Sequence, residues 1–167
     1  VECSFAHGTG LWTGEDRLYV LYQKGGPNVV RAFDLGGHAV GELPQPPLSA
    51  VDDLVVLPDG DVLFEIQSFT VPPAWHRFPR AGGPVTRTDL AETSPADYGD
   101  CEVVREEAVS PDGTRVPITV LRRRGIALAG SHPTILYGYG GYGVSLRPAF
   151  RGRLRAWIER GGVFAVA

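Results

Sequence analysis

The sequence lacks the residues that would form a disulfide framework, a zinc site or a membrane span. Only two cysteines occur in its 167 residues, Cys3 and Cys101, far apart and outside any CxxC or Cys/His spacing, so we expect two ordinary thiols. No apolar run approaches the roughly 18 residues that cross a bilayer, and no charged start followed by an apolar stretch marks a signal peptide. We therefore expect no metal, no other cofactor and no membrane partner.

The sequence also lacks an excess of basic residues. Its formal net charge is -3 and its pI is near 5.8, whereas nucleic-acid-binding domains are usually basic. We therefore expect no nucleic-acid partner. With 43% hydrophobic and 21% charged residues, the composition is that of a globular chain with one domain or the joined parts of two.

The first hundred residues have the pattern of short β-strands. Residues 17–23 and 28–34 are β-branched and aromatic runs separated by a glycine-proline turn, and residues 62–67 and 74–78 repeat this layout about 45 residues later. A repeat of about 40 to 50 residues built from short strands is the spacing of a β-propeller blade. From the repeat alone, a plain antiparallel sandwich is an equally good interpretation.

A small, polar, turn-rich stretch over residues 91–100 indicates a connection between two folding units, and we place the boundary between residues 97 and 98. After it, residues 101–110 and 115–122 are expected to be two strands joined by the turn Pro111-Asp112-Gly113-Thr114. The sequence thus predicts residues 1–97 as one unit and residues 98–167 as another.

The second unit has the pattern of an α/β sheet. Residues 134–137 predict a short strand, and residues 150–160 predict a helix that ends at Gly161. The uniformly apolar residues 163–167 predict a buried parallel strand. A βαβ unit that follows an antiparallel hairpin gives a mixed sheet, so the fold class is mixed: antiparallel blades followed by the N-terminal part of an α/β domain.

The most informative segment is Leu136–Gly143, with the sequence LYGYGGYG, which we call the tyrosine-glycine loop. It follows a predicted strand of an α/β sheet, at the edge where ligands bind in such folds. Glycines allow close backbone approach, while tyrosines supply phenolic donors and flat faces. The loop is no phosphate cradle, because it matches neither a GxGxxG helix start nor a GK[ST] ending. On chemistry alone, a loop whose tyrosines only pack is the commoner interpretation.

From about Asp97 to Ala167 the chain resembles the start of the peptidase domain in the prolyl oligopeptidase family. The resemblance rests on three segments in order, SPDGTRVPITVLRRRG, GSHPTILYGYGGYGVSLRPAF and ERGGVFAVA. Upstream, the chain is more loosely similar to that family's last propeller blades. The resemblance implies an α/β-hydrolase domain capped by a β-propeller, and a serine peptidase that cleaves short peptides after proline through an acyl-enzyme.

The resemblance also implies roles for two tyrosines. Tyr139 matches the tyrosine whose hydroxyl helps form the oxyanion hole, and Tyr142 matches an aromatic position that lines the pocket for the proline ring. Tyr137 is left as a packing residue. The implied partner is a short peptide substrate, and we expect a monomeric parent protein in the cytoplasm, with a periplasmic or secreted location left open.

The catalytic triad is not expected within this sequence. No GxSxG motif occurs in it, and Ser131 and His132 precede a strand instead of forming a nucleophile elbow. We expect the family's Ser, Asp and His beyond Ala167, both ends to be cuts in a longer chain, and the isolated fragment to be inactive. Two alternatives stay open: a related oligopeptidase that cuts after basic residues, against which Gly141 is modest evidence, and a non-catalytic propeller that only binds peptides or proteins.

Overall fold

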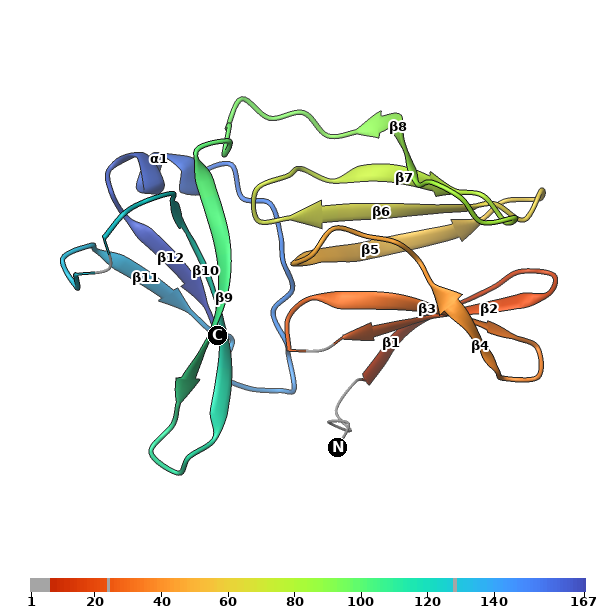
Figure 1. Ribbon diagram of the computed structural model, residues 1–167, viewed down its shortest axis with the longest axis horizontal. Coiled ribbons are helices and arrows are strands. Elements are labelled where there is room, and N and C mark those ends of the chain that lie inside the picture. Colours follow the sequence, from red (N-terminus) through yellow and green to blue (C-terminus); the bar gives the residue numbers. More distant parts are fainter. Residues whose placement is uncertain (1–6, 24, 128) are drawn as a thin grey trace. The chain divides into compact units, whose positions relative to one another are not determined.

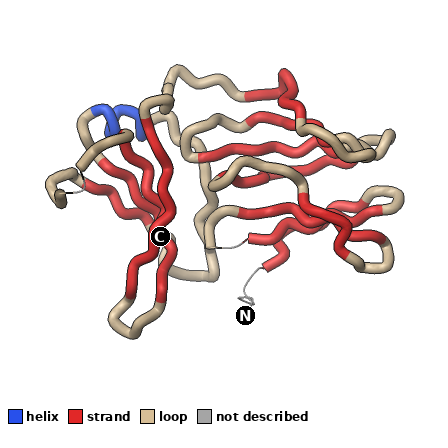
Figure 2. The backbone as a smooth tube through the Cα atoms, in the orientation of Figure 1, coloured by secondary structure: helices blue, strands red, loops and turns tan. Residues whose placement is uncertain are grey.

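The computed structural model describes residues 7–23, 25–127 and 129–167, so Cys3 lies outside the described residues. Within the described residues, the regular secondary structure is almost all β-strand, with one short helix (Figure 1 and Figure 2). Internal contacts divide it into two compact units. Unit 1 comprises Val1–Ser68, Pro72–Glu92 and Arg147–Ala149; unit 2 comprises Phe69–Val71, Thr93–Leu146 and Phe150–Ala167.

Unit 1 contains two four-stranded antiparallel meanders, whose strands pair in sequence order. The first is built from β1 (His7–Thr13), β2 (Arg17–Gln23), β3 (Asn28–Asp34) and β4 (Ala39–Glu42). The second is built from β5 (Ser49–Val56), β6 (Val62–Ser68), β7 (Ala74–Phe78) and β8 (Thr86–Ala91). Because β2 and β6 are each the second strand of their sheet, the repeat seen in the sequence is confirmed as a repeat of whole sheets.

The core of unit 1 follows from alternation along the strands. In β6, Val62, Phe64 and Ile66 are buried while the residues between them are partly exposed, as expected for a sheet with one covered face. The buried Asn28 side chain links the two sheets, because its Nδ2 donates to the Val51 carbonyl at 2.9 Å and its Oδ1 accepts from the Val51 N–H at 2.7 Å. Its amide is thus satisfied on both sides, as a buried polar group requires.

Unit 2 contains a mixed sheet with the strand order β11-β12-β10-β9. Its elements are β9 (Cys101–Val109), β10 (Arg115–Arg123), β11 (Thr134–Tyr137), α1 (Leu154–Glu159) and β12 (Val163–Val166). β10 pairs antiparallel with both β9 and β12, whereas β11 and β12 are parallel and are connected through α1. The predicted strand-helix-strand order and mixed sheet are confirmed, while the assignment of this sheet to an α/β-hydrolase stays a prediction.

The helix is shorter than predicted. We expected it over residues 150–160, but α1 begins only at Leu154. Before it, Leu154 N–H donates to Arg151 and Arg155 N–H donates to Gly152, which are three-residue turns and not helical bonds. The Tyr98 hydroxyl also donates to the Arg151 carbonyl at 2.8 Å, and Gly152 disfavours helix. These local bonds replace the first predicted turn.

The end of the helix is as predicted. Gly161 has φ of 81°, and its N–H donates to Ile158 while the Gly162 N–H donates to Trp157. This pair of bonds is the Schellman motif, which favours glycine in the left-handed position. A Cβ on Gly162 would lie 2.3 Å from the Trp157 ring, so the close approach of indole and backbone also requires glycine there. No helix within the described ranges is both long and apolar enough to cross a membrane.

Candidate functional site

The tyrosine-glycine loop begins at the carboxyl edge of the parallel strand pair. Tyr137 and Val166 are register partners at the ends of β11 and β12, and the Ala167 N–H donates to the Tyr137 carbonyl at 3.1 Å. Tyr139 follows two residues later, and 52% of it is exposed. The Tyr139 side chain is therefore accessible at the sheet edge where ligands bind in α/β folds.

Tyr142 lies in a strained turn of the same loop. The Val144 N–H donates to the Gly141 carbonyl at 3.2 Å, and the two central residues, Tyr142 and Gly143, have φ of 56° and 66°. Positive φ at both positions is the pattern of a type I′ turn. For a residue other than glycine this conformation costs about 1–2 kcal/mol, and Tyr142 is 98% exposed, so its side chain gains little packing in return. Strain of this kind concentrates at binding sites.

Tyr137 has a packing role, as predicted. It packs against the buried cluster of unit 2, and the Arg151 guanidinium lies 5.1 Å from its ring centre. The same guanidinium lies 5.9 Å from the Phe164 ring in β12. Arg151 thus covers two aromatic faces, one of them that of Tyr137 within the loop, a cation-π arrangement that the sequence pattern did not reveal.

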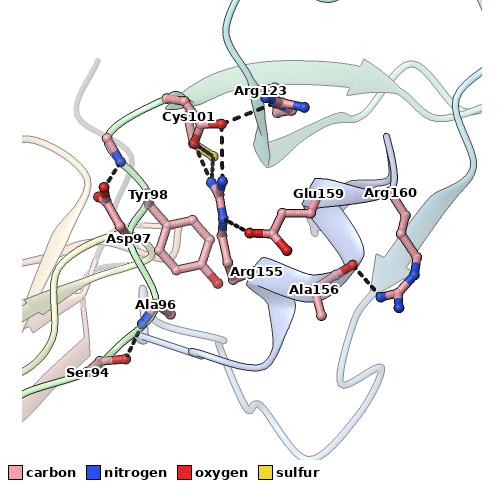
Figure 3. A network of polar contacts seen from close by, with 12 residues as sticks. Ser94, Ala96, Asp97, Tyr98, Cys101, Arg123, Arg155, Ala156, Glu159 and Arg160 are labelled. Carbon is pink, nitrogen blue, oxygen red and sulfur yellow. Dashed lines mark hydrogen bonds and ion pairs between the residues drawn. The ribbon is translucent and has the colours of Figure 1, made fainter.

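A polar network fixes α1 to the start of β9 (Figure 3). Two guanidinium nitrogens of Arg155 donate to the Asp100 carboxylate, and Arg155 Nε donates to Glu159 at 2.9 Å. Arg123 Nε lies 3.1 Å from the same Asp100 carboxylate. The hydrogen bonds that Asp100 accepts from Arg155 and then from the Cys101 thiol hold the pKa of Asp100 well below its usual range, and the charges of Arg155 and Arg123 lower it further.

Two other titratable groups of the network are held in their neutral forms. Burial raises the pKa of the Cys101 thiol to about 11, with Asp100 adding to the effect. Burial likewise raises the pKa of Tyr98 to about 12. Because the thiolate is the reactive form of cysteine, Cys101 is a structural thiol at neutral pH, and the network braces the helix without offering a nucleophile.

The remaining candidates from the sequence are structural or carry no chemistry here. His132 Nδ1 lies 3.1 Å from the Gly161 carbonyl oxygen, so the ring supports the end of the helix. Among residues 7–23, 25–127 and 129–167, no three His, Cys, Asp or Glu side chains gather in a way that could hold a metal ion. The site therefore consists of a phenol donor and an exposed aromatic face on a glycine-rich turn, and it suits binding and polarisation of a polar substrate group.

Comparisons with known proteins find relatives along nearly the whole chain. A prolyl endopeptidase of Elizabethkingia miricola is 26% identical over 157 residues, which cover 92% of this chain and 22% of that protein. An uncharacterized peptidase, y4nA, of Sinorhizobium fredii is 31% identical over 164 residues, which cover 95% of this chain and 22% of that protein. The chain thus spans less than a quarter of the length of these relatives. No family model matches it.

Solved structures give the same picture. A prolyl endopeptidase structure superposes with a TM-score of 0.86 at 30% identity and covers 99% of this chain and 24% of the other. Oligopeptidase B from Trypanosoma brucei superposes with a TM-score of 0.81 at 23% identity, with 100% and 25% of the two chains covered. At that lower identity the likeness concerns the fold alone. The two meanders of unit 1 match the propeller blades of these enzymes.

Proposed function

This chain belongs to the prolyl oligopeptidase family, and on that premise we propose that it forms part of a serine peptidase that hydrolyses short peptides on the carboxyl side of proline. The observation that carries the proposal is the half-exposed Tyr139 at the carboxyl edge of β11 and β12. Because the chain spans 22% of its curated relatives, the Ser, Asp and His of the triad are proposed to come from residues outside these 167.

The domain assignment is part of the proposal. Residues 98–167 would begin the α/β-hydrolase peptidase domain, and residues 1–97 would supply the last blades of the propeller. The first assignment is supported by the parallel pair of β11 and β12, which α1 connects along the chain, because such units build α/β sheets. The two four-stranded meanders support the second.

Tyr139 would act as an oxyanion-hole donor. When a serine attacks the peptide carbonyl, the oxygen gains negative charge, and a phenolic O–H aimed at it stabilises the tetrahedral intermediate. Removing one such donor costs about 2.7–4 kcal/mol of transition-state stabilisation. Four glycines in the tyrosine-glycine loop leave its outer surface without side chains beside the phenol, so a peptide backbone can approach closely.

Tyr142 would supply the flat face against which the proline ring packs. Its almost full exposure and left-handed backbone support a role in contacts with a molecule that the structure does not contain. Aromatic rings pack well against the apolar face of such a ligand. We therefore expect Tyr142→Phe to keep most activity and Tyr142→Ala to raise KM more than it lowers kcat.

The test of the proposal is Tyr139→Phe in the full-length protein that contains this chain. We expect kcat for a proline-containing peptide to fall by roughly a hundredfold or more, with the unfolding temperature unchanged. The matched control is Tyr137→Phe, which keeps the ring that stacks against Arg151 and loses only a hydroxyl. An unchanged kcat in the Tyr139→Phe variant would remove the oxyanion role.

A second candidate is a peptidase that cuts after basic residues. This candidate is suggested by the shared fold of the oligopeptidase B structures, which are 23% identical to this chain. The curated relatives of 26% and 27% identity over most of the chain, in contrast, are prolyl endopeptidases. Matched peptides with proline or arginine before the scissile bond separate the two. A protein that binds both but cleaves neither would instead be a non-catalytic module. The cytoplasmic location and monomeric state stay predictions.

A further inference from the structure

Residues from both sheets of unit 1 line two adjoining hollows. The first has a volume of about 340 Å³ and is lined by the β1–β2 turn, the β5–β6 turn and Arg80, which follows β7. The second has a volume of about 250 Å³ and is lined by parts of β2, β3 and β4 together with Phe78 and Arg80. Arg17, Tyr19 and Arg80 line both hollows. The space beside these three residues is therefore large enough for a small molecule.

Arg80 is a fixed part of the wall, and its charge is already paired. Its backbone N–H donates to Asp61 Oδ1 at 2.9 Å, and its Nη2 donates to Asp16 Oδ2 at 2.9 Å. The carboxylate of Glu15 lies 4.0 Å from its Nη1. A Cβ on Gly60 would overlap the Arg80 side chain, so the glycine lets the arginine cross the β5–β6 turn and reach the first sheet.

Arg17 differs from Arg80 because its charge lies toward the core. Alternate residues of a strand face the same side, so Arg17 shares a face of β2 with the buried Tyr19 and Leu21. The side chain of Arg17 is itself partly buried. A charge that is partly removed from water is unfavourable unless it is paired. Arg17 is therefore a residue that favours an anionic partner.

The acidic residues near Arg17 have other partners. Asp34 is opposite Arg17 in the pairing of β2 with β3, but its carboxylate accepts from the His38 N–H at 2.9 Å and lies 3.0 Å from His38 Nδ1. Glu42, which lines the second hollow, pairs with Arg31 at 2.9 Å. Within the part of the chain that the structure describes, no carboxylate pairs with Arg17. The guanidinium is thus available to a ligand.

Tyr19 supplies a second donor in the same place. Only 3% of Tyr19 is exposed, and its hydroxyl makes no hydrogen bond to any residue between 7 and 167 that the structure describes. Buried polar groups usually have a hydrogen-bond partner. Because Tyr19 lines both hollows, a ligand bound there can be that partner.

We propose that the two hollows form a binding site for a ligand with a carboxylate beside an apolar group, as in the C-terminal residue of a peptide. The planar guanidinium of Arg17 matches the two oxygens of a carboxylate, and the Tyr19 hydroxyl donates to one of them. Leu43 and Phe78 in the second hollow receive the apolar group. A single available guanidinium suits this singly charged group better than a phosphate. The inference is independent of the role of Tyr139.

The experiment titrates the full-length protein with N-acetyl-leucine and with the uncharged N-acetyl-leucinamide, by calorimetry. We expect the acid to bind, and the amide to bind about tenfold more weakly or less. Arg17→Gln and Tyr19→Phe should each weaken binding of the acid by about tenfold or more, because each removes a hydrogen bond to a charged group. The matched control is Arg87→Gln, an exposed arginine of unit 1 that lines neither hollow and should leave the affinity unchanged.

Thermal unfolding without ligand separates binding from a structural role. Since the two side chains have no partner in the described residues, Arg17→Gln and Tyr19→Phe should keep the unfolding temperature of the wild type, whereas N-acetyl-leucine should raise that of the wild type alone. A clear fall in either variant would show a structural partner and overturn the proposal.

The acid and a longer peptide distinguish two sources of the carboxylate. Tighter binding of acetyl-Ala-Ala-Leu than of N-acetyl-leucine would support the site and assign it to peptide C-termini, and equal binding would support it as a site for small carboxylates. The proposal would be overturned by equal binding of acid and amide, by inorganic phosphate binding as tightly as the acid, or by binding that persists in Arg17→Gln. No binding of either acid would overturn it as well.

Discussion

The two units are stabilised by different interactions. Among the described residues, the buried cluster of unit 1 has ten members, and of these only Tyr19 carries a polar side-chain atom. The cluster of unit 2 is smaller and includes Tyr98 and Cys101, next to the ionic network of Asp100. Burial of apolar surface depends little on pH, whereas an ionised carboxylate in a network does. We therefore expect unit 1 to resist changes in pH and unit 2 to respond to them.

Ion pairs in unit 1 do not contradict this difference. Arg77 pairs with Asp59 and Asp61, and Arg80 pairs with Asp16, but these side chains are largely on the surface. Surface ion pairs contribute at most about 1 kcal/mol each. The buried polar residue of unit 1 that links its sheets is the uncharged Asn28. The stability of unit 1 therefore depends mainly on packing. The largest expected effect on it comes from removing a packed side chain.

Phe64→Ala should destabilise unit 1 most. Phe64 is fully buried at the centre of β6, and truncating a buried phenylalanine costs about 3–5 kcal/mol of unfolding free energy. Hydrogen exchange in the full-length protein should show faster exchange across β5, β6 and β7, at all pH values near neutrality. The control is Val55→Ala, at an exposed position of the neighbouring strand. A cost for Phe64→Ala below that of the control would show that packing does not dominate unit 1.

Arg155→Gln should weaken unit 2 and remove part of its response to acid. The folded-state pKa of Asp100 is below its usual value, so the stabilisation is present above about pH 4 and is lost as pH falls toward the folded-state pKa. Without Arg155, this loss becomes smaller, and unit 2 is less stable at pH 7. Trp157 fluorescence in a Trp12→Phe/Trp75→Phe background would report unfolding of α1 as a function of pH.

The matched control for this variant is Arg160→Gln. Arg160 caps the same helix, and within the described part of the chain its side chain donates only to the Ala156 carbonyl. It should change neither the stability at pH 7 nor the acid profile. If Arg155→Gln and wild type unfolded along the same pH curve, the Asp100 network would contribute nothing to the difference between the units.

The sequence predicted the strands whose alternation is regular. β2, β3, β7 and β11 have the predicted bounds, because each is a short β-branched or aromatic run between turn residues. The sequence pattern does not reveal β1, β4, β5 and β8. β4 is wholly exposed and β8 nearly so, so neither has an apolar face to reveal it. In β5 the bulge at Asp52 shifts the alternation by one residue, and this hides the strand from a two-residue period.

The candidate site likewise has residues that the sequence could predict and residues that it could not. The residues of the tyrosine-glycine loop could be singled out because they are adjacent in sequence and resemble a family motif. Arg151 could not, since its ring partners Tyr137 and Phe164 come from two different strands. An arginine in a sequence does not show which carboxylate or ring it will meet. The positions of Tyr139 and Tyr142 are consistent with their implied roles, which remain predictions until the variants are measured.

The smallest expected effect concerns Glu65, a charged residue of unit 1 whose ionisation affects the stability of that unit. The pKa of Glu65 is raised, first by burial and then by Asp52, Glu92 and Asp53, so the fold disfavours its ionised form. A raised folded-state pKa for an acid means that stability is highest below the unfolded value of 4.5 and decreases as pH rises through the folded value. This pH dependence is opposite in sign to that of Asp100 in unit 2.

Glu65→Gln removes the charge and keeps the shape of the side chain. It should therefore stabilise unit 1 slightly at pH 7, and the gain should disappear below about pH 4, where the glutamate of the wild type is protonated. Denaturant unfolding at pH 4 and pH 7 measures the difference, with Glu106→Gln at an exposed position of β9 as the control. A loss of stability at pH 7 would mean that the Glu65 carboxylate makes a favourable contact that outweighs its acidic neighbours. Unit 1 would then depend on a charged group, as unit 2 does, and the contrast between an apolar and an ionic unit would no longer hold.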